Sequence, residues 1–185
     1  MITLKPYRTG HFSTAFKLSD NKILLQSRDK VKECMAHGWF PESRMFPKIE
    51  FSDLKIVNFD NSENLYEMPF YEQPKSFKKT LSPRQWRLFK ALRAVGVRLS
   101  CGFANYNRTL LEQLEGIPYE FRKERDALLE AVDALYNYSE KVGFEFSPRN
   151  LAVKGNKLIL LDVFFLRDEI GHIYTRTKRQ ITVSK

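Results

Sequence analysis

Alternating apolar and polar residues run through the first third of the chain and break at turn residues. The clearest case is the pair of runs at 10–18 and 22–27, which flank a Ser-Asp-Asn turn. Such alternation around a tight turn is typical of an antiparallel hairpin. Shorter runs of the same kind predict further strands at residues 3–5, 54–59 and 63–71. The pattern therefore predicts a five-stranded antiparallel sheet.

Helical spacing appears once within this sheet and then dominates the chain. A short helix is predicted from about Asp29 to His37, where a glycine follows as a natural helix stop. Beyond residues 72–81, whose composition is that of a linker, apolar residues recur every three or four positions. These stripes predict three helices. The first begins at Pro83, the second covers 107–114 with Asn107 as its cap, and the third covers 119–141.

A second hairpin occupies residues 144–165. It consists of a polar loop, a short strand, a Lys-Gly-Asn-Lys turn at 154–157 and an apolar strand that ends at Asp162. Because a tight turn brings the outer ends of its strands together, we expect Asn150 and Asp162 side by side, with Glu145 at the same rim. Amide and carboxylate oxygens suit Mg²⁺, so a cation site is one interpretation. Asn and Asp also occur at hairpin ends simply because they suit turns.

Composition narrows the possible partners. The chain carries 31 Lys and Arg against 22 Asp and Glu, a formal net charge of +9. This surplus favours nucleotides, nucleic acid or acidic proteins as partners, although the basic residues are dispersed. No apolar run approaches the roughly 20 residues of a membrane span, so a soluble, cytoplasmic protein without a membrane partner is expected. Cys34 and Cys101 lack the spacing of a zinc site or a disulfide framework.

The order of parts resembles that of protein kinases: a sheet with one helix, a linker, helices, then a polar loop and a hairpin that ends on Asp. Residues 7–16, Tyr-Arg-Thr-Gly-His-Phe-Ser-Thr-Ala-Phe, are similar to the glycine-rich loop that covers nucleotide phosphates. Residues 65–69 look like the strand that enters the hinge, and 145–150 have the spacing of the catalytic-loop acid and Asn. Residues 162–164 stand at the place of the Asp-Phe-Gly motif. More narrowly, these motifs resemble the early Ser/Thr protein kinases of T7-like bacteriophages.

This resemblance implies an α+β, bilobal, protein-kinase-like fold, with a sheet-rich lobe over 1–71, a hinge over 72–81 and a reduced helical lobe over 82–185. It implies ATP and Mg²⁺ as cofactors. The catalytic residues that it implies are Glu145, which would orient or deprotonate an acceptor hydroxyl, and Asn150 and Asp162, which would hold Mg²⁺. The nucleotide-binding residues that it implies are Gly10, His11, Phe12, Ser13, Gln26, Glu33, Glu67 and Met68.

The sequence departs from the kinase pattern at several positions. Only Gly10 remains of the glycine-rich loop, and Gln26 stands where a phosphate-binding Lys is expected. Glu33, which resembles the helix Glu that pairs with that Lys, would then lack its partner. Lys22 and Lys30 lie nearby but out of register. The acid of the catalytic loop is Glu rather than Asp, and the third position of the Asp-Phe-Gly motif is Phe.

Three functions therefore compete. The first is an active Ser/Thr protein kinase, made by a phage to modify host proteins in the host cytoplasm. The second is a pseudokinase that binds a host protein, with or without nucleotide. The third is a basic nucleic-acid-binding protein of another fold, which only the net charge suggests. The retained Asn150 and Asp162 favour the first function, and the missing Lys favours the second.

Overall fold

The structure, a computed structural model, describes residues 1–10, 13–57, 63–100, 106–167 and 180–184. The chain divides into two compact units. The first unit comprises Met1–Gly38, Lys48–Phe70 and Ile170–Lys185, and the second comprises Trp39–Pro47 and Tyr71–Glu169. Among the described helices, none has both the length and the apolar composition of a membrane span.

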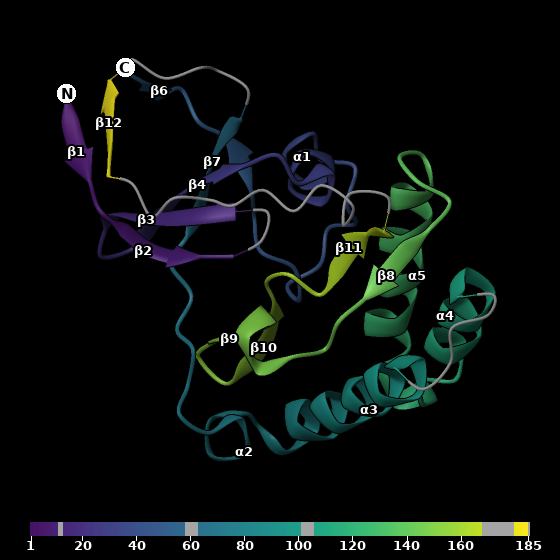
Figure 1. The fold of residues 1–185 in the computed structure, drawn as a ribbon. Helices are drawn as coiled ribbons and strands as arrows, with labels where there is room; N and C mark the ends of the chain where they lie inside the picture. Colours follow the sequence, from purple (N-terminus) through teal and green to yellow (C-terminus); the bar gives the residue numbers. More distant parts are fainter. Residues whose placement is uncertain (11–12, 58–62, 101–105, 168–179, 185) are drawn as a thin grey trace. The chain divides into compact units, whose positions relative to one another are not determined.

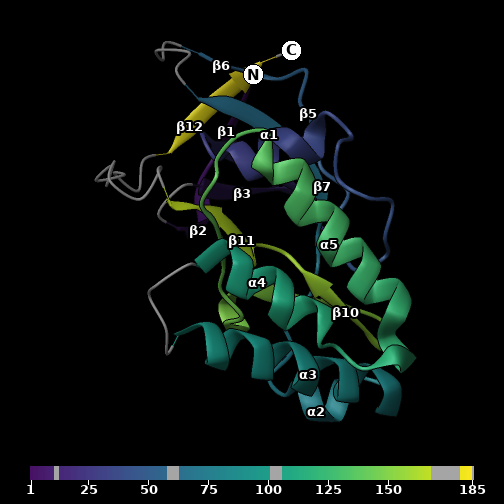
Figure 2. The same ribbon diagram turned by 90° about the vertical axis from the view of Figure 1, so that its right-hand side faces the viewer.

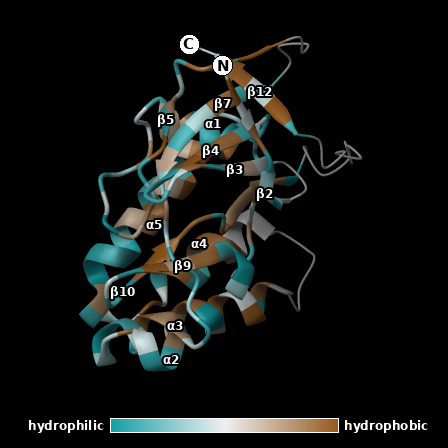
Figure 3. Ribbon diagram, turned by 90° about the vertical axis from the view of Figure 1, so that its left-hand side faces the viewer, coloured by the Kyte–Doolittle hydropathy of each residue, from teal (hydrophilic) through white to brown (hydrophobic). Residues whose placement is uncertain are grey.

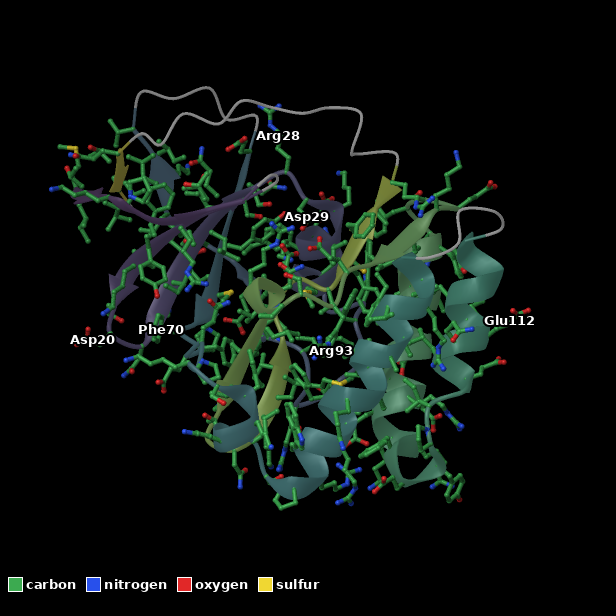
Figure 4. All side chains as sticks on the ribbon, turned by 60° about the horizontal axis from the view of Figure 1, so that its bottom comes forward. Asp20, Arg28, Asp29, Phe70, Arg93 and Glu112 are labelled. Carbon is green, nitrogen blue, oxygen red and sulfur yellow. The ribbon has the colours of Figure 1, made fainter. Side chains whose placement is uncertain are left out.

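The first unit is built on a five-stranded antiparallel sheet with the order β2-β3-β4-β7-β5 (Figure 1). Its strands are β2 (Pro6–Thr9), β3 (Ser13–Ser19), β4 (Lys22–Ser27), β5 (Glu50–Phe51) and β7 (Asn64–Pro69). The central strand β4 buries five of its six residues, as expected for a strand paired on both edges. The turn at Asp20 and the residue after β7, Phe70, lie at the same end of the sheet (Figure 4), where the Phe70 N–H donates to the Asn21 carbonyl at 2.8 Å.

Helix α1 (Lys30–Ala36) follows β4 and confirms the predicted helix. Its N-terminus is capped by Asp29, whose carboxylate accepts a hydrogen bond from the Val31 N–H at 2.9 Å. At its other end Gly38 adopts a φ of 74°, a left-handed conformation that favours glycine. The predicted start near Asp29 and the predicted stop at the glycine are therefore both confirmed.

A second sheet of the first unit has three strands in the order β1-β12-β6. They are β1 (Ile2–Leu4), β6 (Lys55–Ile56) and β12 (Ile181–Ser184). In β12 the residues Ile181 and Val183 are 7% and 1% exposed, and they join one core cluster with Phe16 and Leu24. The alternation of β12 thus supplies an apolar face to the first unit.

The two units and the pairing of β12 correct three sequence predictions: the bounds of both lobes and the strand expected at 54–59. The range 82–185 was expected to be one continuous helical lobe, yet its last described strand belongs to the first unit, because β12 buries its apolar face against that unit's core. Residues 39–47 conversely belong to the second unit. In the described part of the run expected at 54–59, strand β6 covers two residues and pairs with β12 rather than with the large sheet. The large sheet contains β5 instead. The sequence also predicts a short strand at 172–175, and these positions lie outside the described residues.

The second unit contains the described helices other than α1. They are α2 (Phe77–Thr80), α3 (Pro83–Ser100), α4 (Tyr106–Glu115) and α5 (Arg122–Tyr136), the last preceded by a 3-10 turn at Tyr119–Phe121. Figure 2 shows α4 lying between α3 and α5. The fully buried residues recur at helical spacing, as predicted: Leu88, Leu92, Val95, Leu110, Leu114, Leu128, Val132 and Leu135.

Three details of the helical part differ from the prediction. The expected linker contains the short helix α2, which has no apolar period long enough to reveal it. Helix α4 begins at Tyr106, so Asn107 lies inside it and is not its cap. Helix α5 ends at Tyr136 and not at residue 141. Tyr138, which would lie on the apolar stripe of the longer predicted helix, therefore follows the helix.

Two small antiparallel sheets complete the second unit. The predicted hairpin is confirmed as β9 (Leu151–Lys154) and β10 (Lys157–Leu160), with Gly155 at a φ of 61° in its turn. Its hydrophobic residues are visible in Figure 3. The other sheet pairs β8 (Val142–Phe144) with β11 (Phe164–Leu166). These two strands, which the sequence analysis did not predict, flank the loop and the aspartate of the candidate site.

Candidate functional site

Backbone hydrogen bonds bring the three predicted catalytic residues together in the second unit. The Asn150 carbonyl accepts from the N–H groups of Leu161, at 2.8 Å, and of Asp162, at 3.2 Å. The Glu145 N–H donates to the carbonyl of Val163 at 2.7 Å. Asn150 and Asp162 therefore lie next to each other at the open end of the β9–β10 hairpin, and Glu145 enters the same region.

Asn150 is held so that one side-chain oxygen remains available. It ends a 3-10 turn at Pro148–Asn150 and is only 9% exposed. Its Nδ2 donates to the carbonyl of Glu145 at 3.4 Å. The Oδ1 atom accepts no hydrogen bond from a described residue, so it is free to coordinate a ligand. Asp162, in contrast, is exposed to solvent.

The side chain of Glu145 is partly engaged. Its Oε1 accepts a hydrogen bond from Arg149 at 2.8 Å, and the two side chains are 43% and 67% exposed. An ion pair so open to water contributes little to stability. Gln73 fixes the same loop by donating to the carbonyl of Arg149 at 2.7 Å. The second carboxylate oxygen of Glu145 has no such partner among the described residues, so it can still accept a proton or a hydrogen bond.

The donor set fits a magnesium ion that shares its coordination with a nucleotide. One amide oxygen and one carboxylate are hard oxygen ligands, and Mg²⁺ is usually bound by one or two carboxylates, with phosphates and water completing its shell. Across the described ranges, no cluster of three or more His, Cys, Asp or Glu side chains is arranged to hold a metal by itself. Burial raises the pKa of Cys34 to about 11, so its thiol is protonated at neutral pH.

The residues expected to bind nucleotide lie in the first unit. The turn between β2 and β3 is closed by Gly10, whose N–H donates to the Ser13 carbonyl at 2.8 Å. The Ser13 hydroxyl is 2.7 Å from that of Ser27. Gln26 lies on the central strand β4 and is 7% exposed. His11 and Phe12 lie outside the described residues.

The acidic residues of this set are already paired. Glu67, on β7, accepts from the Lys22 ammonium at 2.6 Å and from the Ser52 hydroxyl at 2.8 Å. The hydrogen bond to Glu67 raises the pKa of Lys22. Met68 follows on the same strand and is opposite Ile23. Glu33 pairs with Lys30 of the same helix at 2.8 Å. The cation beside Glu33 is therefore a helix residue one turn away and not a residue of β4.

Lys32 is a buried cation that the sequence analysis missed. It is 4% exposed, and its Nζ lies 3.4 Å from the carboxylate of Asp29, which is 3% exposed. Burial raises the pKa of the nearby Tyr66 hydroxyl to about 12, and the charges of Glu33, Asp29 and Lys32 also act on this group. A lysine is expected at the surface unless it is paired. The local sequence signal for the burial of Lys32 was its position three residues after Asp29, the residue that caps the helix.

A glycine of β8 allows that strand to pair closely with β11, next to the Glu145–Asn150 loop. Gly143 is opposite Phe165 of β11, and a Cβ added to Gly143 would overlap the Phe165 ring. We expect Gly143→Ala to lower the free energy of unfolding by about 1–2 kcal/mol, because the ring must leave its packed position. Chemical denaturation measures this loss. In a Phe165→Ala background the same glycine substitution should cost much less; an equal cost in both backgrounds would contradict the steric explanation.

The likeness of this chain to known proteins is weak. No protein-family model matches the chain, and no curated protein matches it either. Among solved structures, the ternary complex of streptomycin, ATP and APH(2")-IIa, an aminoglycoside phosphotransferase with a protein-kinase-like fold, matches with 14% sequence identity and a TM-score of 0.36. The match covers 89% of this chain and 68% of that chain. At this TM-score and identity the likeness does not establish a shared activity, so the α+β, two-unit organisation stands on the strands, helices and units described above.

Proposed function

We propose that the chain is a protein-kinase-like phosphotransferase that moves the γ-phosphate of ATP to Ser or Thr hydroxyls of a protein, a host protein if a phage encodes it. The observation that carries this proposal is the pairing of Asn150 and Asp162. Their backbones are hydrogen-bonded to each other, and Asn150 presents an unused oxygen beside an exposed carboxylate. An amide oxygen beside a carboxylate is a ligand pair that suits ATP-bound Mg²⁺.

Each residue of the site has a role in this proposal. Asp162 and Asn150 would hold Mg²⁺, which supplies charge neutralisation at the transferred phosphoryl group. Glu145 would orient the acceptor hydroxyl and accept its proton through the carboxylate oxygen that Arg149 leaves free. Phosphoryl transfer depends mainly on positioning and electrostatics, so a fixed loop and one oriented carboxylate can serve it.

The nucleotide-binding residues of the first unit also stay part of the proposal. Backbone groups from Gly10 to Ser13 would contact phosphates, and the hydrogen bond from the Gly10 N–H to the Ser13 carbonyl would fix the two ends of that turn. Main-chain groups of Glu67 and Met68 would contact the adenine. The Glu67 carboxylate is engaged by Lys22 and Ser52 and is not needed for that contact.

The test is transfer of labelled phosphate. The full chain is incubated with γ-labelled ATP, Mg²⁺ and a mixture of bacterial proteins, and label is followed on Ser and Thr by phosphoamino-acid analysis. The proposal expects label on protein that requires Mg²⁺ and is lost with EDTA. Absence of label, together with no effect of ATP and Mg²⁺ on thermal unfolding, would overturn it.

A pseudokinase that binds a host protein is the second candidate, and the first unit supplies the observation that favours it. Gln26 occupies the expected lysine position on β4, while Lys22 and Lys30 are each paired with a glutamate. Neither lysine then needs a phosphate as its partner. Stabilisation by ATP and Mg²⁺ without transfer of label would select this candidate. Binding of nucleic acid that collapses with salt, without any effect of ATP, would instead select the basic nucleic-acid-binding protein.

A further inference from the structure

A basic pocket lies in the second unit, at the opposite end of the β9–β10 hairpin from Asn150 and Asp162. Its volume is about 210 Å³. Along the strand, Lys157 at the pocket and Asp162 at the candidate site are separated by roughly 15 Å. The pocket is lined by Ser43, Arg44, Met45, Arg84, Gln85, Leu88, Lys123, Glu124, Lys157 and Leu158. These residues come from the 43–45 segment, the first two turns of α3, the first turn of α5, and β10.

The charges around this pocket are not balanced. Four cations line it with a single carboxylate, Glu124. That carboxylate is taken by Arg84, whose two terminal nitrogens donate to its two oxygens. The same contact lowers the pKa of Glu124, which keeps it ionised and bound to Arg84. Arg44, Lys123 and Lys157 form no ion pair with any residue in the described part of the chain, although the charge of Lys123 also acts on Glu124. The lining therefore carries four positive charges against one negative charge.

Neutral groups complete the lining. The Gln85 Oε1 accepts a hydrogen bond from the Leu158 N–H at 3.0 Å. The NH₂ group of the same side chain can therefore donate a hydrogen bond to a ligand. The Leu160 N–H donates to the Met45 carbonyl at 2.8 Å and fastens the 43–45 segment to β10. Met45, Leu88 and Leu158 are 4%, 1% and 1% exposed. An apolar base of this kind strengthens the attraction of the cations for an anion.

We propose that this pocket binds a phosphate monoester dianion, held by Arg44, Lys123 and Lys157 together with the Gln85 amide. A dianion offset by three cations matches the uncompensated charge, and Arg and Lys are the usual phosphate-binding side chains. The volume is below the roughly 300–1,000 Å³ of sites for drug-sized ligands, so only a small anionic group fits. The proposal goes beyond the phosphotransferase function and does not depend on it, because the pocket shares no residue with Glu145, Asn150 and Asp162.

The test follows the side-chain amide of Gln85 and the backbone amide of Leu158 by NMR. The full chain, without ATP, is titrated with inorganic phosphate at constant ionic strength, with chloride as the compensating salt. We expect saturable shifts of both signals. In Arg44→Gln/Lys157→Gln the dissociation constant should rise at least about tenfold, since two charge-assisted contacts are lost. All the replaced side chains are exposed, so the variant should fold.

The matched control is Arg93→Gln/Lys154→Gln, which removes the same charge from α3 and the hairpin but leaves the pocket lining intact. Its dissociation constant should stay within about twofold of that of the unmodified chain. Equal weakening in both double variants, or shifts that do not saturate, would overturn the proposal in favour of general attraction to a chain of net charge +9. Asp162→Ala should bind phosphate normally, which separates this test from that of the phosphotransferase.

Two further titrations identify the source of the phosphate, using O-phosphoserine and a short phosphoserine peptide. Tighter binding of the peptide supports a phosphorylated protein as the ligand, and equal affinities support a free phosphate monoester. Unphosphorylated serine should give no shift, and a shift of equal size with serine would contradict a site for phosphate.

Discussion

Asp162→Ala is expected to lower the rate of labelled phosphate transfer by about 10²–10³-fold. The substitution removes the carboxylate proposed to hold Mg²⁺ against the terminal phosphates, so the charge that develops in the transition state loses its main stabilisation. Asn150→Ala should reduce the rate by a similar factor, because it removes the other oxygen ligand. Rates are measured with saturating ATP and Mg²⁺, by label incorporated into protein per unit time.

Each variant has a control of the same residue type. Asn156→Ala removes an exposed amide from the turn of the same hairpin, and Glu130→Ala removes an exposed carboxylate from α5. Both should transfer label at the unmodified rate. Asp162 is exposed and the Asn150 side chain makes one long hydrogen bond of 3.4 Å, so neither alanine variant should unfold the chain. Unchanged labelling in Asp162→Ala would remove this residue from the mechanism.

Val183→Asp is expected to lower the free energy of unfolding of the first unit by about 3 kcal/mol or more. Val183 is 1% exposed in the core cluster that joins β1 and β12 to the large sheet. A carboxylate there would be buried without a cation, or β12 would have to leave its place. Denaturation by urea measures the loss, and hydrogen exchange should accelerate in β3 and β4 but not in α3 and α5.

Thr182→Asp is the matched control, because it places the same charge one residue away on the outward face of β12. Thr182 is only partly buried, and its hydroxyl meets that of Thr3 at an exposed position. Its stability should stay within about 0.5 kcal/mol of that of the unmodified chain. Equal losses in Thr182→Asp and Val183→Asp would contradict the orientation of β12, and no loss in either would contradict its place in the core of the first unit.

The sequence predicts this fold best where the signal is local. The turns after Ser19 and Lys154 join strands that pair immediately, so turn chemistry and alternation suffice to place both hairpins. The start of α1 follows from the cap at Asp29 for the same reason. The alternating residues of β12 are visible in the sequence, but its partner β1 lies at the other end of the chain, and local pattern carries no information about such a distant pairing.

The candidate site divides in the same way. The neighbourhood of Asn150 and Asp162 follows from one hairpin, and backbone hydrogen bonds between the two residues confirm it. The burial of Lys32 beside Asp29 depends on the packing of α1 in the first unit and could not be read from its position in the sequence. The basic pocket was missed because its cations come from four separate segments, each of which looks like an ordinary charged surface.

The central claim is that the side chains of Asn150 and Asp162 together hold a metal-bound nucleotide. Paramagnetic broadening tests it directly: Mn²⁺ is added in substoichiometric amounts to the isotope-labelled chain with ATP, in place of Mg²⁺. The prediction is that the Asn150 side-chain amide and the Asp162 backbone amide broaden first, while the Asn156 amide at the far end of the hairpin stays sharp. Sharp signals from Asn150 and Asp162, with broadening elsewhere in the chain, would contradict it.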